Sequence, residues 1–235
     1  MTSKSFAEIL DEAFEQCSRM DASLNQRLQA FADTVRKLNP TFAEAVDRLV
    51  TRLHEAGAGT AAPAPGDEMP NFLLPDDMGH LVSLEEILQK GPVALAFHRG
   101  HWCPYCRINT NALVEAQSKA QAEGSQIAAI LPERRQFASE LRAEAKAPFP
   151  ILLDMDNGYA MSLNLAICVG EEMKRMMAES GWDLPAYQGN DAWMLPIPAT
   201  FIVATDGRIT ARFVDPDYRK RMAIEDMLDA LKAAH

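Results

Sequence analysis

Residues 92–113, PVALAFHRGHWCPYCRINTNAL, hold the pattern on which the fold prediction depends. Residues 92–98 are a continuous apolar run of strand length, which is typical of a parallel strand buried on both faces. Cys103 and Cys106 follow this run, and a helical pattern then continues to about Gly124. The thiols are therefore expected at the start of a helix, where free backbone N–H groups and the helix dipole stabilise an anion.

Strands and helices alternate after this stretch. The segments QIAAIL (126–131) and FPILLD (149–154) are predicted as buried strands, with a helix over the sequence ERRQFASELRAEAK between them. Residues 199–215 are predicted as two strands around Asp206-Gly207, a strong hairpin signal, followed by an amphipathic helix. A βαβ unit followed by a hairpin and a helix is the outline of the thioredoxin fold, so the fold class is α/β.

The chain before this region has a different pattern. Residues 1–57 are predicted as a helical extension, residues 58–69 as a Gly- and Pro-rich linker, and residues 70–235 as the thioredoxin-like domain. Residues 70–84 add two short strands at the start of that domain. Capping-box patterns predict the helix starts; they pair Ser5 with Glu8, Ser23 with Gln26, Thr41 with Glu44, and Ser83 with Glu86.

An insertion is predicted at about residues 165–197, between the third strand and the hairpin. It carries methionines at helical spacing and scattered aromatic residues, which indicate a packed core or, alternatively, an adaptable binding surface over the cysteine motif. Two further cysteines, Cys17 and Cys168, lie in apolar segments and are predicted to be buried. Cys168 has the alternative interpretation of a distant resolving cysteine.

Composition excludes several classes of function. The chain has 235 residues, 48% of them hydrophobic, and a formal net charge of −10, which disfavours nucleic acid and anionic membranes as partners. The first 20 residues resemble neither a signal peptide nor a membrane span, so a cytoplasmic location is expected. Four cysteines in a chain of this length favour a catalytic pair over a disulfide scaffold. Neither a metal site nor a cofactor is predicted, because no second set of Cys or His ligands is present.

Three segments together resemble the peroxiredoxin-like group of the AhpC/TSA family. They are GDEMPNFLLPDDMGHLVSLEEIL, GPVALAFHRGHWCPYC and LPIPATFIVATDGRITARFVDPDYRKRM, and the resemblance extends from about residue 64 to residue 233. It implies a thioredoxin fold with an added N-terminal β-hairpin and a thiol-dependent peroxidase activity. The implied substrate is hydrogen peroxide or an organic hydroperoxide, and a thioredoxin- or glutathione-type donor would reduce the oxidised pair. A homodimer is a further expectation.

The motif departs from the family pattern P-x-x-x-T-x-x-C at several positions. The pattern places Cys106 at the attacking position, Cys103 in place of the Thr, and Arg99 in place of the Pro. Pro198 stands where many members have an Arg that activates the peroxide. The sequence WCPYC also resembles the thioredoxin motif, which would make Cys103 the nucleophile instead. The pair is therefore predicted as catalytic, and the identity of the attacking cysteine stays open.

Neighbouring residues are candidates for supporting roles. Arg99 could supply positive charge to the thiolate and the departing oxygen, or be a surface charge on a loop. Trp102 could shield the site from water, or simply pack. Pro198 lies where thioredoxin-fold proteins keep a cis proline facing the thiols. Two alternative functions stay open, a thioredoxin-like protein disulfide reductase and a non-catalytic redox sensor.

Overall fold

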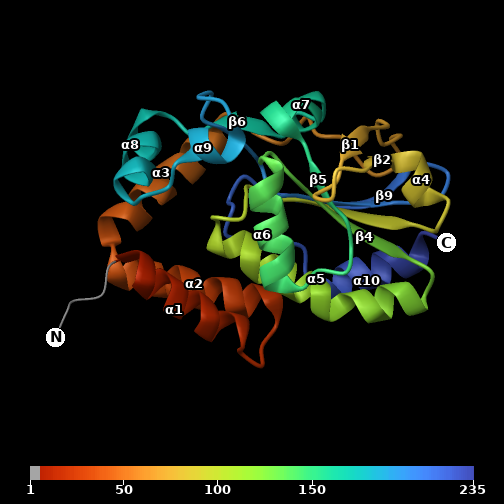
Figure 1. The fold of residues 1–235 in the computed structure, drawn as a ribbon, viewed down its shortest axis with the longest axis horizontal. Coiled ribbons are helices and arrows are strands. Elements are labelled where there is room, and N and C mark those ends of the chain that lie inside the picture. The colour runs from red at the N-terminus through yellow and green to blue at the C-terminus, as the bar shows by residue number, and fades with distance from the viewer. Residues whose placement is uncertain (1–5) are drawn as a thin grey trace.

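The computed structural model describes residues 6–235, and the side chains from residue 9 onward. Its centre is a five-stranded sheet with the order β5-β4-β3-β8-β9 (Figure 1). The central β3 pairs in parallel with β4 and antiparallel with β8. The strands are β3 (Val93–Phe97), β4 (Gln126–Leu131), β5 (Ile151–Leu153), β8 (Ala199–Val203) and β9 (Ile209–Val214). This mixed sheet has the thioredoxin topology, and the predicted α/β fold class is confirmed.

Helices cover both faces of the sheet, because β3 is apolar on both sides. Ala94 and Ala96 belong to a core that includes residues of α5, α6 and α10, whereas Leu95 and Phe97 pack on the opposite face with residues of α4 and α7. Small alanines on the first face let the long α5 approach the strand closely. The helices are α4 (Leu84–Leu88), α5 (Pro104–Ala122), α6 (Arg135–Ala145), α7 (Gly158–Ser162) and α10 (Ile224–Ala233).

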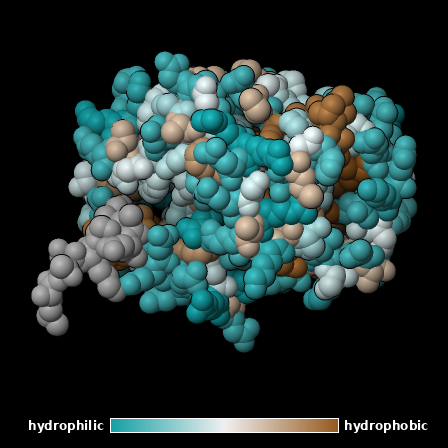
Figure 2. Space-filling model, viewed as in Figure 1, coloured by the Kyte–Doolittle hydropathy of each residue, from teal (hydrophilic) through white to brown (hydrophobic). Residues whose placement is uncertain are grey.

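A β-hairpin precedes the sheet, as the sequence predicts. It pairs β1 (Leu73–Pro75) with β2 (Leu81–Ser83). The capping box of Ser83 and Glu86 is present at the start of α4, which confirms that prediction. Leu73, Met78 and Leu81 are exposed on this hairpin. Figure 2 shows hydrophobic surface in the region that β1 and β2 occupy in Figure 1.

The N-terminal segment forms α1 (Phe6–Ser18), α2 (Leu24–Leu38) and α3 (Pro40–Glu55). The capping box of Ser23 with Gln26 is confirmed. The one predicted at Thr41 is wrong, because α3 begins at Pro40 and Asn39 supplies the side chain that caps the N–H of Phe42. Proline at the first helical position loses no hydrogen bond, so it fixes this earlier start. The capping box predicted from Ser5 to Glu8 lies outside the residues whose side chains are described.

The insertion between α7 and β8 is compact. It contains β6 (Ala166–Cys168), α8 (Glu171–Glu179), α9 (Leu184–Gln188) and β7 (Met194–Pro196), with β6 and β7 paired antiparallel. A short 3₁₀ turn, Met155–Asn157, precedes α7. Within the described part of the chain, no helix is long and apolar enough to cross a membrane.

A third core joins the N-terminal helices to the rest of the molecule. It contains apolar side chains of α1, α2 and α3, the first turns of α5, and Met173 and Met177 of α8. Cys17 is buried in this core, as predicted. Cys168 is exposed on β6, so the prediction of burial is wrong there. Its strand pairs only with the short β7 among the described residues, and one side is left to solvent. The third core therefore encloses the start of α5, where the cysteine motif lies.

Candidate active site

The cysteine motif lies at the N-terminus of α5, directly after β3. Cys103 is the N-cap residue of α5, and Cys106 lies in its first turn. Both thiols are free and buried, with exposed fractions of 1% and 0%. The two residues come within 3.5 Å of each other. The strand, loop and helix therefore hold the two cysteines together at the positive end of a helix dipole.

Two nitrogen donors converge on the sulfur of Cys106. The backbone N–H of Arg99 lies 3.3 Å from Cys106 Sγ, and Nη2 of Arg221 lies 3.4 Å from it. Arg221 is itself buried, and its Nη1 donates to the carbonyls of Tyr218 and Lys220 at 2.6 Å each. The backbone carbonyls of its own segment thus fix the Arg221 guanidinium, and its positive charge faces the sulfur of Cys106.

The two thiols differ in acidity. Burial alone would raise the pKa of Cys106, but a hydrogen bond from Cys103, the charge of Arg221 and the Arg99 N–H together bring it well below its ordinary value. Burial raises the pKa of Cys103 well above its ordinary value, and the hydrogen bond to Cys106 adds to that rise. The donors around Cys106 therefore favour a thiolate on that sulfur over one on Cys103.

His98 is a buried, hydrogen-bonded residue behind Cys106. Its Nε2 lies 2.9 Å from Nδ2 of Asn109, and its Nδ1 lies 3.4 Å from Oγ1 of Thr110. The Thr110 hydroxyl in turn donates to the carbonyl of Cys106 at 2.9 Å. Because Asn109 donates to Nε2, the proton lies on Nδ1. Burial lowers the pKa of His98 to about 4, so the ring is neutral near pH 7.

A buried carboxylate holds the loop between β3 and α5. Glu133 accepts hydrogen bonds from the backbone N–H and the ring Nδ1 of His101, at 2.7 and 2.8 Å. Gly100 has a φ of +148°, and a Cβ there would meet Trp102 Nε1 at 2.4 Å and Glu133 Oε1 at 2.6 Å. Only glycine fits this close approach. Glu133 and the close approach at Gly100 therefore fix the loop that leads to the cysteines.

Arg99 is buried, which excludes the surface-charge interpretation. Its guanidinium lies 3.7 Å from the centre of the Tyr218 ring and 5.0 Å from that of Trp102. The contact with Cys106 comes from the backbone of Arg99, whereas the side chain lies beside Cys103 in the wall of a pocket. Trp102 is 9% exposed and lines the same pocket.

The sequence leaves the isomer at Pro198 open. Among the residues that the structure describes, no peptide bond is cis, so the bond before Pro198 is trans. Pro198 is buried, and the pairing of Phe97 with Ala199 places it beside His98, at the end of the sheet from which the cysteine loop departs. It lies between β7 and β8. The pairing of β7 with β6 and of β8 with β3 fixes an extended backbone on either side of it.

Sequence reasoning missed Arg221 and Tyr218. Both lie in the segment DPDYRKRM, which follows β9. This segment contributes to the family resemblance as a whole, and the resemblance singles out neither residue. Arg219, Lys220 and Arg221 are three consecutive cations, and nothing in their order distinguishes the buried one. Lys220 is exposed and pairs with Asp215, whereas Arg219 pairs with Asp47 and Asp217.

The fold and the paired thiols define a thiol-based oxidoreductase of the thioredoxin-fold class. A family model described as the AhpC/TSA family matches residues 65–212, which is more than half of the chain. The chain therefore belongs to the AhpC/TSA family, and its class is that of peroxiredoxin-type oxidoreductases. No curated protein matches the sequence.

Solved structures of low sequence identity share the fold. The peroxidoxin BcpB of Mycobacterium tuberculosis is 18% identical, with a TM-score of 0.57 over 73% of this chain and 98% of that chain. A 1-Cys peroxiredoxin from yeast mitochondria is 16% identical, with a TM-score of 0.54 over 71% and 73% of the two chains. The bacterioferritin comigratory protein of Xanthomonas campestris is 12% identical, with a TM-score of 0.52 over 74% and 94%.

Proposed function

We propose that this protein is a thiol-dependent peroxidase that reduces hydroperoxides through Cys106 and Cys103. The observation that carries the proposal is the surroundings of Cys106 Sγ, which accepts hydrogen bonds from the Arg99 N–H and the Arg221 guanidinium at the start of α5. The thiolate is the nucleophilic form of cysteine, and positive charge and N–H donors favour it. Relatives in fold are peroxiredoxins, and the Xanthomonas protein among them is described as reducing alkyl peroxides.

The reaction begins with the Cys106 thiolate. It attacks one oxygen of the peroxide and forms an S–O bond while the O–O bond breaks, so sulfur is oxidised and the peroxide is reduced. The departing oxygen carries the negative charge away and becomes an alcohol or water when it takes a proton. Arg221 and Arg99 supply positive charge near that oxygen, and Trp102 keeps bulk water from the sulfur.

Cys103 then resolves the sulfenic acid. Its sulfur attacks Cys106, a disulfide forms, and the oxygen leaves as water together with the proton of the Cys103 thiol. The pair needs little movement for this step, because the two cysteines are within 3.5 Å. In this scheme Cys103 is the resolving residue, and Cys106 is the one that meets the peroxide.

An external thiol returns the pair to its reduced state by disulfide exchange. The pocket beside the motif is lined by Cys103 and not by Cys106, so the reductant is expected to attack Cys103. Cys106 is then the leaving group, and a sulfur of low pKa leaves faster. We propose a thioredoxin- or glutathione-type donor, the two systems with which the yeast relative is described.

Burial favours the peroxidase over a protein disulfide reductase. Cys103 and Cys106 are almost wholly inaccessible, and α1, α2 and α3 pack around the start of α5. A protein disulfide must approach a sulfur in line and at contact distance, which this enclosure opposes; the same enclosure favours the smaller glutathione-type donor over thioredoxin in the recycling step. A small peroxide meets a much lower steric barrier.

The test combines a single-turnover reaction with steady-state turnover. Reduced wild type, Cys103→Ser and Cys106→Ser are mixed with hydrogen peroxide in the presence of a sulfenic-acid probe. We expect Cys103→Ser to be labelled at residue 106 and Cys106→Ser to remain unlabelled. NADPH consumption with thioredoxin and thioredoxin reductase should be sustained only by the wild type. Labelling of Cys103 in the Cys106→Ser variant would reverse the assigned roles, and a lack of reaction with peroxide in all three proteins would refute the activity.

A further inference from the structure

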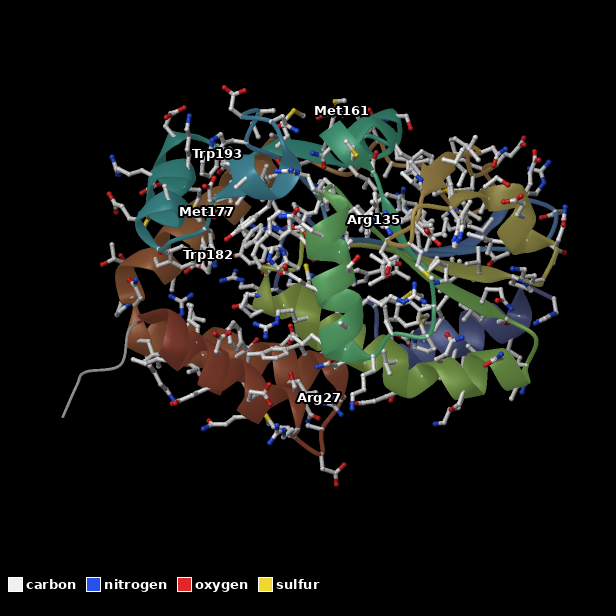
Figure 3. The ribbon with its side chains drawn as sticks, in the orientation of Figure 1. Arg27, Arg135, Met161, Met177, Trp182 and Trp193 are labelled. Carbon is white, nitrogen blue, oxygen red and sulfur yellow. The ribbon has the colours of Figure 1, made fainter. Side chains whose placement is uncertain are left out.

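A pocket opens beside Cys103, and much of its wall lies outside the family-matched residues 65–212. Leu10, Phe31, Phe42 and Val46 come from the N-terminal helices, and Tyr218 comes from the segment after β9. Met173 and Met177 of α8 close another side. Figure 3 shows Met177 and Trp182 near α3, on the side of the molecule that α8 occupies. Most of this wall therefore lies outside the part of the chain that the family model matches.

The wall is aromatic and continuous. The rings of Phe31 and Tyr105 are 5.1 Å apart, and those of Tyr105 and Tyr218 are 5.4 Å apart, both edge to face. On the other side, the ring of Trp182 lies 5.7 Å from that of Phe42 and 5.7 Å from that of Trp102. Both sets of rings line the pocket beside Cys103, and aromatic rings pack well against another ring.

The charges around the pocket exclude a cationic ligand. The guanidinium of Arg99 is buried in its wall, stacked on Tyr218. Arg36 and Arg219 also line the pocket and both pair with Asp47. An aromatic cage can hold a quaternary ammonium, but a buried arginine within the cage repels it. A neutral aromatic group fits, and Arg99 favours a polar oxygen group at the inner end.

The pocket is narrow and its walls can adjust. Its volume is about 40 Å³, well below that of an open small-molecule site, so in this conformation it is a slot between side chains that must widen to admit a ring. Met173 and Met177 are unbranched thioethers that can change rotamer to widen it. A flat ring is the shape that such a slot accepts.

We propose that this pocket binds the aromatic body of an aryl-alkyl hydroperoxide and directs its O–O group toward the cysteine pair. The assignment rests on the proposed peroxidase function and narrows its substrate class. Cys103 lines the pocket and Cys106 lies within 3.5 Å of that residue, so the O–O group must pass Cys103 to react. The Cys106 thiolate then bonds to the terminal oxygen, the O–O bond breaks, and the aryl-alkyl oxygen leaves and takes a proton to become the alcohol. Hydrogen peroxide has no aromatic group to occupy the pocket, so the pocket adds nothing to its binding.

The kinetic test compares cumene hydroperoxide with hydrogen peroxide. Val46→Phe places a ring inside the pocket, and Ala43→Leu is a milder substitution in the same wall. Thr51→Phe adds the same ring to an exposed position of the same helix as a matched control. We expect Val46→Phe to lower kcat/KM for cumene hydroperoxide by about tenfold or more relative to kcat/KM for hydrogen peroxide. Equal losses for both peroxides in Val46→Phe and Ala43→Leu would overturn the proposal.

Binding is measured separately, so that the pocket and the peroxidase can fail independently. The probe is 2-phenyl-2-propanol, the alcohol that cumene hydroperoxide yields, and the readout is the fluorescence of the tryptophans in the reduced wild type. We expect saturable binding that Val46→Phe weakens by about tenfold and Thr51→Phe leaves unchanged. Turnover of hydrogen peroxide without binding of the alcohol would overturn the pocket assignment and leave the peroxidase. Binding of the alcohol without turnover of either peroxide would overturn the peroxidase and, with it, the pocket's role as a substrate site.

Discussion

The two sides of the first turn of α5 differ sharply in chemistry. On the Cys106 side, polar groups converge on one sulfur, namely the Arg99 N–H and the Arg221 guanidinium. On the Cys103 side, aromatic rings line a pocket, with Tyr105 and Tyr218 among them. One side sets the charge on a thiolate, and the other controls what reaches it. Acidity and access can therefore vary independently in this site.

The two sides also differ in origin. The Arg99 N–H comes from the loop after β3, within the family-matched residues, whereas the aromatic wall depends on α2 and α3, which lie before them. Arg221 also lies beyond the match. The shared fold thus supplies the position of the thiols, and the added segments supply the enclosure. Substitutions on one side at a time test whether acidity and access are in fact independent.

Phe31→Ala should have the largest effect, on the aromatic side. Phe31 is 1% exposed and contacts the ring of Tyr105 edge to face. Removal of a fully buried ring lowers the free energy of unfolding by about 3 to 5 kcal/mol. Urea denaturation measures the loss, and Lys37→Ala on the exposed face of the same helix should change it by less than about 0.5 kcal/mol. A loss below about 1 kcal/mol for Phe31→Ala would mean that α2 is not tightly packed on α5.

The pH dependence of stability should come next, on the polar side. Burial lowers the pKa of His98 to about 4 in the folded chain, whereas the unfolded histidine titrates near its ordinary value of 6.5. The unfolded state therefore binds more protons between these values, and the stabilisation present above pH 6.5 is lost as the pH falls toward 4. The expected loss is up to roughly 3 kcal/mol.

His98→Gln isolates this contribution, because glutamine carries no titrating ring. Denaturation of both proteins across this pH range should show a shallower decline in the variant. Parallel curves would contradict the low pKa of His98.

Arg221→Met should slow the reaction with peroxide. An opposite charge within hydrogen-bond distance lowers a pKa by about one to three units, so its loss should lower the thiolate fraction near pH 7 by up to about 1000-fold. The rate should recover at higher pH, where the thiolate forms without help. Lys220→Met removes the neighbouring exposed cation and should leave the rate within about twofold. Equal losses in both variants would point to a general charge effect instead.

Asp11→Asn should have the smallest effect. Asp11 pairs with Arg107 at 3.0 Å, but its side chain is 67% exposed, and Arg107 keeps Glu144 and the ring of Phe14 as partners. The free energy of unfolding should fall by less than about 1 kcal/mol in a urea titration. A loss as large as that of Phe31→Ala would show that ion pairs, and not apolar packing, hold the N-terminal helices in place.

Local patterns predict much of the fold. The apolar run of β3, the alternation after it and the Asp206-Gly207 turn each depend on nearby residues, and the structure has a strand or turn at each of them. The position of Cys103 and Cys106 at the start of α5 follows from the same local pattern. Where two local signals compete, the prediction fails, as at Thr41, where Asn39 and Pro40 determine the helix start instead.

Long-range contacts account for the rest. Arg221 approaches Cys106 across 115 positions of sequence, and no local pattern distinguishes it from Arg219 and Lys220. The sequence shows Arg99 only as a charged residue in a loop. Its side chain is buried because it packs against Tyr218 and Trp102. The aromatic pocket likewise depends on how α3 and α8 meet, which the spacing of residues along either helix does not determine.

A pH titration of thiolate absorbance shows whether Cys106 holds the thiolate. Wild type, Cys103→Ser and Cys106→Ser are titrated in the reduced state. Serine at position 103 can still donate a hydrogen bond to sulfur, so the account predicts a thiolate of low pKa in wild type and in Cys103→Ser, and its loss in Cys106→Ser. A thiolate of low pKa that persists in Cys106→Ser and disappears in Cys103→Ser would contradict the account and assign the charge to Cys103.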